Sequence, residues 1–294
     1  MATLRQIRQR IRSVGSISQV TRAMEMIAAA EMRRAQQATL ASRNYSEKAR
    51  EVMQYVATEP GRSKNLHPLL DERPQVNAIA VVLYTADRGL AGAYNINIIR
   101  KTLDFIRPFE RDGKPIHLIT VGRRGRDLMR RFGKQVVADF SGLGTRPEIV
   151  QVSALARAAL DEFTSGRVDQ VHLAYTDFVN VLRQTPTIAR VLPIQAAEIK
   201  HEGPPQVYLY EPSAEALLDQ VLPRFVQVQI YQALLESNAS EQAARMVAMR
   251  NATDNAKELI ESLTLLRNKV RQASITREIL DIVGGAEALR KSME

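Results

Sequence analysis

Both ends of the chain carry apolar residues at helical spacing. Between positions 3 and 57 these residues recur in steps of three and four, which is the period of one helical face. They are Leu4, Ile7, Ile11, Val14, Ile17, Val20, Met24 and Ile27, followed by a weaker stripe from Ala28 to Val56. Thr3 is a suitable N-cap, and the Pro-Gly pair at positions 60 and 61 should end the helix. A helix this long needs a partner along its apolar face.

The C-terminal segment has the pattern of such a partner. A strict alternation of steps of three and four passes through mostly apolar positions, which favours a coiled coil over an ordinary surface helix. The seam positions are Leu235, Asn238, Gln242, Arg245, Met249, Ala252, Ala256, Leu259, Leu263, Leu266, Val270, Ala273, Arg277 and Leu280. The pattern extends back to about Ser213. Pro223 is expected to kink or interrupt this helix, and Gly284 and Gly285 are expected to fray its end.

The two segments together predict an antiparallel two-helix coiled coil with an inserted α/β domain. The expected segments are residues 1–60 and 212–294 for the two helices and 75–195 for the α/β domain. Alternatively, each helix pairs with a second chain, as in a dimer. The polar seam residues Asn238, Gln242 and Arg245 either are buried and set the register, or mark a solvated stretch where the helices splay apart.

Strand and helix patterns alternate in the middle of the chain. The predicted strands are 76–85, 115–122, 136–140, 168–178 and 185–194, and the predicted helices are 92–108, 123–132 and 147–165. Alternation of this kind indicates a mostly parallel, Rossmann-like sheet covered by helices. Only a short turn separates the last two strands, so one edge of the sheet should be a hairpin.

The α/β domain lacks the motifs of a nucleotide site or a catalytic centre. A dinucleotide fingerprint needs G-x-G-x-x-G after the first strand, but residues 87–92 read DRGLAG and residues 122–125 read GRRG. There is no P-loop. Gly89 and Gly92 are therefore interpreted as sites of backbone turning and close helix–sheet packing. The four histidines, which are His67, His117, His172 and His201, lack metal-ligand spacing. We predict no cofactor, metal or catalytic residue.

The composition adds a basic charge and excludes some chemistry. The net charge is +9, and residues 1–57 hold ten Lys/Arg against four Asp/Glu. A basic stripe can meet nucleic acid, anionic lipid or an acidic protein, and Arg5, Arg8 and Arg12 form either a solubilising face or such a contact. The absence of Cys excludes disulfides and fits a reducing compartment. No apolar run reaches the length that spans a bilayer.

Several blocks of residues resemble the gamma subunit of F-type ATP synthases. They are Thr3 to Ile11, Thr21 to Ala30, Asp87 to Asn95, Ser240 to Met246, Ala252 to Ala256 and Arg271 to Glu278. The resemblance covers nearly the whole chain, with the blocks in the family's order. Ala91 stands where many members carry Cys, and a Cys-bearing regulatory insert of the chloroplast type is absent. The absence of that insert implies a bacterial-type enzyme.

The resemblance implies a non-catalytic rotor in the central stalk of a proton-transporting complex. Its coiled coil would stand inside a ring of alpha and beta subunits, and its foot, with an epsilon subunit, would sit on the membrane ring of c subunits. ATP chemistry would belong to the beta subunits, in agreement with the missing P-loop. The resemblance further implies one copy per complex, no cofactor, no bound nucleic acid, and a peripheral place on the cytoplasmic side of the cell membrane.

Matching the family's motifs also assigns contact residues. Those expected to meet beta-subunit loops are Arg245, Arg271, Gln272, Thr276, Glu278 and, on the first helix, Met24. Those expected to meet the c ring are Tyr208, Tyr210 and Glu211. For each of them the alternative is an ordinary solvated side chain.

Two other classes of protein compete with this interpretation. A basic coiled coil that binds nucleic acid would explain the net charge and would show steeply salt-sensitive binding, but the sequence lacks an aromatic platform or a basic-region motif. An α/β enzyme with helical dimerisation arms would need a convergent catalytic constellation, which the sequence does not contain.

Overall fold

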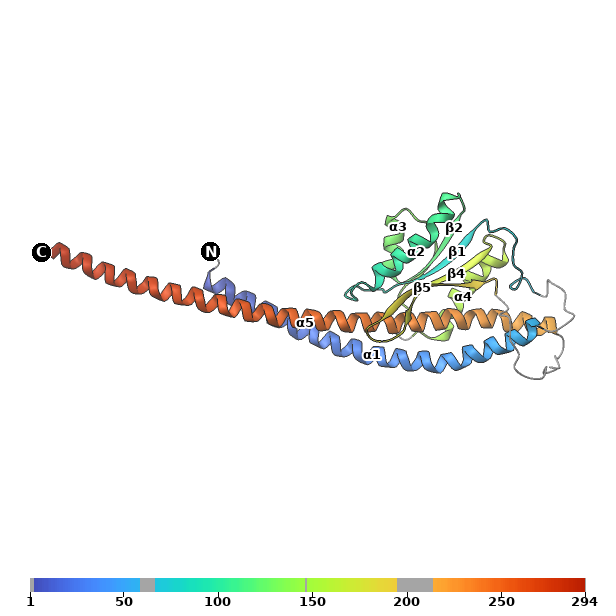
Figure 1. Cartoon of the computed structure of the whole chain (residues 1–294), viewed down its shortest axis with the longest axis horizontal. Helices are drawn as coiled ribbons and strands as arrows, with labels where there is room; N and C mark the ends of the chain where they lie inside the picture. The colour runs from blue at the N-terminus through green and yellow to red at the C-terminus, as the bar shows by residue number, and fades with distance from the viewer. Residues whose placement is uncertain (1–2, 59–66, 146, 195–213, 294) are drawn as a thin grey trace. The chain divides into compact units, whose positions relative to one another are not determined.

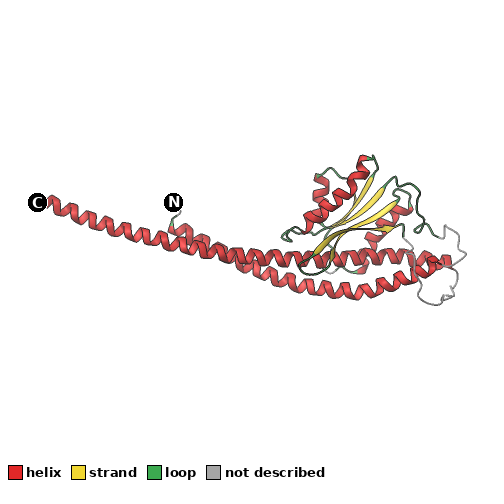
Figure 2. Cartoon of the chain, in the orientation of Figure 1, coloured by secondary structure: helices red, strands yellow, loops and turns green. Residues whose placement is uncertain are grey.

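Two long helices enclose five strands and three shorter helices in the sequence. The computed structural model describes residues 3–58, 67–145, 147–194 and 214–293 (Figures 1 and 2). The helices are α1 (Leu4–Thr58), α2 (Tyr94–Arg111), α3 (Arg123–Arg131), α4 (Ile149–Thr164) and α5 (Ala214–Met293). The strands are β1 (Ile79–Tyr84), β2 (Ile116–Val121), β3 (Val136–Phe140), β4 (Gln170–Phe178) and β5 (Gln184–Leu192). All predicted elements of the middle segment are present, with their ends shifted by a few residues.

The chain forms two compact units. One comprises residues 28–245 and contains the whole sheet, and the other comprises residues 1–27 and 246–294. We call the first the sheet unit and the second the helical unit. Helices α1 and α5 contribute residues to both.

The sheet has the order β3-β2-β1-β4-β5. Strands β1 to β4 are parallel neighbours, and β5 pairs antiparallel with β4 as an edge hairpin. The predicted fold class is therefore confirmed, including the hairpin edge.

Helices cover both faces of the sheet, and β1 is therefore buried on both sides. Its residues Ile79, Val81 and Leu83 pack on one face with α2 and α3. The alternate residues, such as Val82 and Tyr84, pack on the other face with α4 and the first part of α5. A continuous apolar run such as IAVVLY is typical of a parallel strand that is covered on both faces.

Helix α5 is buried almost all round within the sheet unit, which decides between the two alternatives for its polar seam residues. Asn238 and Gln242 are only 9% and 4% exposed, so the polar seam residues there do not mark a solvated splay. Pro223 does not interrupt the helix. Its neighbours Leu222 and Val226 are fully buried in the core, so burial of this turn outweighs the lost backbone hydrogen bond.

In the helical unit α1 and α5 pair antiparallel, but the seam differs in part from the prediction. The hydroxyls of Thr21 and Thr253 meet across it at 2.7 Å, and Ile7 and Ala256 are buried. The predicted seam residues that are instead exposed are Ile17, Val20, Ile27, Leu259, Leu266, Ala273, Arg277 and Leu280. A 3.6-residue helix drifts relative to a 3.5-residue repeat, so a second apolar row can satisfy the same spacing.

The end of α5 also differs from expectation. The helix continues through Gly284 and Gly285 to Met293, so the glycines do not end it. A glycine inside a helix costs about 1 kcal/mol relative to alanine, which lowers the stability of the helix without stopping it.

At the start of α1 the predicted cap is present. The hydroxyl of Thr3 accepts a hydrogen bond from the backbone N–H of Gln6, and the Gln6 side chain accepts one from the Thr3 N–H. This reciprocal pair satisfies two N–H groups that would otherwise lack a partner within the helix.

Candidate functional site

The helix that follows β2, α3, begins at the carboxyl ends of the strands, and its N-terminus is occupied by the chain itself. Ligands of doubly wound sheets lie at the carboxyl ends of the strands, on the N-terminus of the following helix. Here the first N–H groups of α3 already have partners. Arg123 N–H donates to the Asp87 carboxylate (3.0 Å), and Gly125 N–H donates to the Thr85 hydroxyl (2.8 Å). The Arg124 N–H donates to the carbonyl of Ala86. The donors of α3 that would hold a phosphate are thus occupied.

The glycines of the GRRG segment serve this close packing. Gly122 has a φ of +91°, and a Cβ there would lie 2.1 Å from the carbonyl oxygen of Thr85. A Cβ on Gly125 would lie 2.7 Å from the Thr85 hydroxyl. Both positions therefore need glycine because β1 and the start of α3 approach each other. The interpretation of the glycines as packing residues thus extends to this pair, with Thr85 as the residue that requires them.

Asp87 joins three loops at the same edge of the sheet. One carboxylate oxygen accepts the N–H of Arg123 after β2, and the other accepts the N–H of Gly142 after β3, at 2.9 Å. Asp87 itself follows β1. A carboxylate at the N-terminus of a helix also interacts favourably with the helix dipole.

Tyr94, the first residue of α2, meets α5. Tyr94 is 6% exposed, and its hydroxyl lies 2.7 Å from that of Ser237, which is 1% exposed. Burial is the main cause that raises the pKa of Tyr94, so the phenol stays protonated. Further along α5, Ser240 donates to the carbonyl of Thr176 at the end of β4. Hydrogen bonds thus fix one stretch of α5 to the carboxyl ends of two strands.

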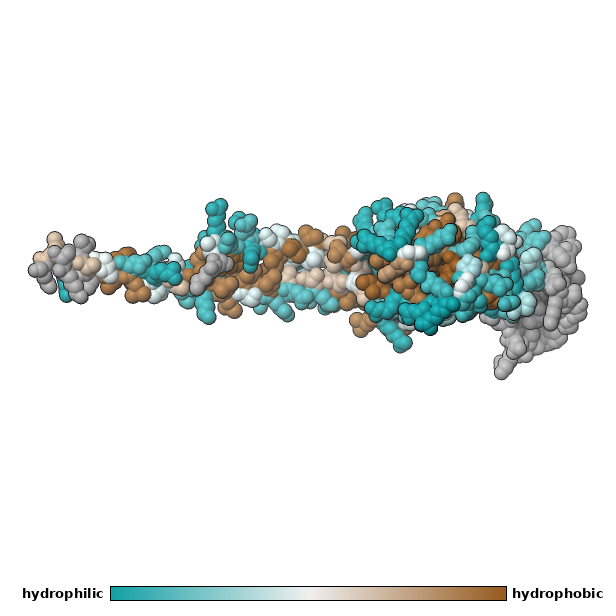
Figure 3. All heavy atoms as spheres, turned by 90° about the horizontal axis from the view of Figure 1, so that it is seen from above, coloured by the Kyte–Doolittle hydropathy of each residue, from teal (hydrophilic) through white to brown (hydrophobic). Residues whose placement is uncertain are grey.

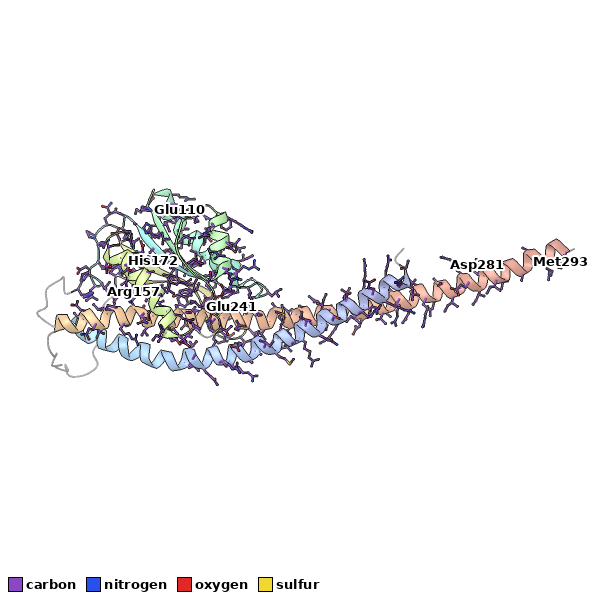
Figure 4. All side chains as sticks on the ribbon, turned by 180° about the vertical axis from the view of Figure 1, so that it is seen from behind. Glu110, Arg157, His172, Glu241, Asp281 and Met293 are labelled. Carbon is purple, nitrogen blue, oxygen red and sulfur yellow. The ribbon has the colours of Figure 1, made fainter. Side chains whose placement is uncertain are left out.

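Arg245, predicted to be a beta-subunit contact, lies in this same region and is largely buried. Its guanidinium forms a 2.6 Å ion pair with Glu241 and lies 3.4 Å from the carbonyl oxygen of Gly89. The side chains of Arg245 and Glu241 are 12% and 13% exposed. Burial raises the pKa of Glu241, and Arg245 offsets this only in part. Figure 4 labels Glu241 on the stretch of α5 beside the sheet.

The other predicted beta-subunit contacts lie in the helical unit. Arg271, Gln272, Thr276 and Glu278 are all exposed, and Met24 on α1 is half-buried. Gln272 and Thr276 are four residues apart, so they share one face of α5. Glu278 accepts a hydrogen bond from Ser274 within the helix. The predicted c-ring contacts Tyr208, Tyr210 and Glu211 lie outside the described residues.

Exposed apolar side chains are frequent in this unit. From Arg271 to Ala286 the residues of α5 are all exposed. Exposed apolar residues there and along the helix pair are Ile17, Val20, Leu259, Leu265, Leu266, Ile275, Ile279, Leu280, Ile282 and Val283. Figure 3 shows such apolar surface in brown along the paired helices. Apolar exposure on this scale is typical of a surface that a partner covers.

The middle of the chain also carries a concentrated basic charge. Residues 94–134 hold eleven Lys/Arg against four Asp/Glu. They include α2 and α3, which cover the same face of the sheet. Counting charge along helices that share a face would have found this patch, but the sequence alone does not establish that they share it.

His172 lies in an open pocket of about 660 Å³ between α2 and β5. Its ring packs on that of Phe105 at 4.8 Å, and its Nε2 lies 3.0 Å from the Gln170 side-chain oxygen. Burial, with a smaller contribution from the positive charge of Arg190, lowers the pKa of His172 to about 4. Among the residues that the structure describes, no group of three His, Asp or Glu side chains could hold a metal.

Acid should therefore destabilise the protein through His172. Between pH 6.5 and about 4 the unfolded chain binds a proton at this residue and the folded chain does not, so stability falls as the pH falls. We expect His172 to account for about 2 kcal/mol of lost stability between pH 7 and pH 5. Urea unfolding at both pH values checks this. His172→Gln should reduce the difference, and an unchanged difference would contradict the assignment.

The geometry thus describes a long antiparallel helix pair with an inserted α/β domain. A family model described as "ATP synthase" matches residues 3–289. The chain is 50% identical over 289 residues to the "ATP synthase gamma chain" of Dehalococcoides mccartyi strain CBDB1, which covers 98% of this chain and 100% of that one. It is 46% identical over 293 residues to that of Roseiflexus castenholzii, covering 98% and 99%. The chain belongs to the family of ATP synthase gamma chains.

Solved structures agree on the fold. A chain of the Euglena gracilis mitochondrial ATP synthase (OSCP, F1 and c ring) matches with a TM-score of 0.68 and 20% identity, covering 99% of this chain and 96% of that one. A chain of the Tetrahymena thermophila central stalk and c ring matches with a TM-score of 0.59 and 24% identity, covering 79% and 99%. The family resemblance seen in the sequence is confirmed, and no finding supports the nucleic-acid alternative.

Proposed function

We propose that this chain is the rotor of the central stalk in a proton-transporting F-type ATP synthase and has no catalytic residues of its own. The observation that carries the proposal is the match to gamma chains along 98% of this chain and the full length of the relative. The missing P-loop supports a non-catalytic role, because nucleotide chemistry would then belong to other subunits.

The rotor would couple ion flow to ATP synthesis through differences in contact energy. An asymmetric helix pair presents a different side to each of three equivalent sites as it turns. Each orientation stabilises a different conformation of the site that it faces, so rotation changes the affinities of the three sites in sequence. The energy transmitted cannot exceed the difference in contact free energy between these states.

The partners follow from this role. We propose that the exposed end of α5, with Arg271, Gln272, Thr276 and Glu278, contacts beta-subunit loops within a ring of alpha and beta subunits. Met24 would meet such a loop at another level, near the contact between Thr21 and Thr253. We propose that the foot, with Tyr208, Tyr210 and Glu211, contacts the c ring beside an epsilon subunit. One copy would serve each complex, on the cytoplasmic side of the cell membrane. Within the described residues, no helix is both long and apolar enough to cross that membrane.

For Arg245 we propose only a limited contact with the beta subunit. Its ion pair with Glu241 leaves little of the side chain exposed. A beta-subunit loop could reach only the exposed edge of this pair, unless the guanidinium exchanges its partner during rotation.

Copurification from native membranes tests the proposal. A tagged chain should recover alpha and beta subunits with ATPase activity. Membranes that lack the chain should lose ATP synthesis driven by a proton gradient, and the added gene should restore it. Recovery of nucleic acid or of a self-dimer, without ATPase subunits, would overturn the proposal.

A further inference from the structure

The segment between β1 and α2 bonds to two different parts of the sheet unit. We call residues 85–94 the β1–α2 segment. On one side Asp87 holds the loops that follow β2 and β3, through the N–H groups of Arg123 and Gly142. Thr85 adds a bond to the Gly125 N–H. This side of the segment is thereby fixed to three adjacent strands.

On its other side the β1–α2 segment holds α5. Tyr94 and Ser237 share a buried hydroxyl pair at 2.7 Å, and Arg245 lies 3.4 Å from the Gly89 carbonyl oxygen. Ala86, Ala91 and Tyr94 form a small apolar cluster against which Ala244 packs. The segment therefore lies between the strand ends and α5 and touches both through specific contacts.

A buried hydroxyl pair is a stringent contact. Water cannot replace either partner, so separating the two groups leaves buried donors and acceptors unsatisfied. Apolar contacts, in contrast, have no fixed direction and allow sliding. The Tyr94–Ser237 pair thus fixes the position of α5 along and around its axis more tightly than apolar packing alone would.

We infer that the β1–α2 segment is a rigid joint between the sheet and α5, acting beside the shared apolar core and the bonds of Tyr84 to Ile230 and of Ser240 to Thr176. Tyr94, Ser237 and Asp87 are its positioning residues for rotational coupling. The inference rests on the proposed function. In a rotor, force applied to the sheet reaches the catalytic subunits only if α5 turns with it. A joint that slips would allow ATP hydrolysis without a full share of proton transport.

Ser237→Ala in the complete complex tests the inference. It leaves the Tyr94 hydroxyl buried without its partner, and amide exchange over residues 233–243 should become about tenfold faster. ATP hydrolysis should continue while proton pumping per ATP hydrolysed falls. Ser262→Ala is the matched control, because that hydroxyl bonds only to the carbonyl of Leu259 in its own helix. It should leave exchange and pumping unchanged.

The ratio of pumping to hydrolysis distinguishes coupling from folding. If Ser237 served folding alone, the yield of assembled complex would fall while each assembled complex kept its normal ratio, and the inference would be wrong. Tyr94→Phe combined with Ser237→Ala removes both polar groups. The double variant should bring the rate of amide exchange back towards normal, because no buried hydroxyl lacks a partner. The ratio of proton pumping to ATP hydrolysis should recover less, because the directional hydrogen bond is still missing.

A disulfide tests whether the joint stays rigid during turnover. The chain has no Cys, so Ala91→Cys with Ala244→Cys introduces its only thiols, at residues of one packed cluster. The oxidised complex should hydrolyse ATP and pump protons as the reduced one does. Loss of turnover on oxidation, reversed by reductant, would show that the joint moves and would overturn the inference. Failure of the unaltered chain to support ATP synthesis would instead refute the proposed function.

Discussion

Replacing Gln272 and Thr276 together by alanine is expected to lower ATP synthesis by tenfold or more without changing the stability of the chain. Both side chains are exposed on one face of α5, so their removal leaves no cavity. Each would contribute about 1 kcal/mol through a hydrogen bond to a beta-subunit loop, and 1.4 kcal/mol corresponds to a factor of ten. ATP synthesis in inverted membrane vesicles measures the effect.

A control variant on the same helix tests whether the loss of any exposed side chain would lower ATP synthesis. Glu261→Ala also removes an exposed side chain of α5, but at a position that we do not assign to a beta-subunit contact, and it should leave synthesis near the wild-type rate. Normal synthesis by the Gln272 and Thr276 double variant would reject these contacts. It would not affect membership of the gamma-chain family, which rests on the whole sequence.

Gly122→Ala is expected to destabilise the protein by about 3 kcal/mol or more. The new Cβ would lie 2.1 Å from the carbonyl oxygen of Thr85, which belongs to the backbone and cannot rotate away. The positive φ of +91° adds strain for any residue with a side chain. Relief requires β1 and α3 to separate, which would disturb the Asp87 hydrogen bonds beside them. Urea unfolding of the whole chain, followed by circular dichroism, measures the loss.

Gly133→Ala supplies the matched comparison. Gly133 has a φ of +70°, but a Cβ there would meet no atom within 4 Å. Its substitution should therefore cost only the conformational strain, about 1 kcal/mol. Equal losses for the two variants would mean that the close approach of Thr85 has no energetic consequence.

Much of the fold could be predicted because its signals are local. The continuous apolar run at Ile79–Tyr84 predicts a buried strand, and Thr3 predicts a helix start that the structure confirms. The family also follows from sequence alone, because the matched blocks are long and occur in order. The contact residues at the end of α5 remain a prediction.

The tertiary structure decided what spacing alone could not. The predicted stripe on α1 shares Ile7 and Ala28 with the buried face of the helix. The structure also buries Thr21 there and leaves the predicted residues Ile17 and Val20 exposed. Small side chains such as Thr21 and Ala28 allow the two helices to approach closely. A hydrophobicity pattern does not reveal this, because it ranks Ile17 and Val20 above them. Similarly, Pro223 reads as a helix breaker, but the buried residues around it hold the helix together.

The contact between the β1–α2 segment and α5 also depends on the tertiary structure and not on the sequence pattern alone. The sequence places Asp87 and Tyr94 in a family motif, and Ser237 beside a predicted seam, but it contains no signal that joins them. Tyr94 and Ser237 lie 143 positions apart and meet only because the parallel sheet brings the end of β1 against α5. Local patterns of side chains determine which elements form and which family the chain joins. Contacts between distant segments exist only once the sheet has closed and α5 has packed against it, and those contacts decide which polar residues are buried together.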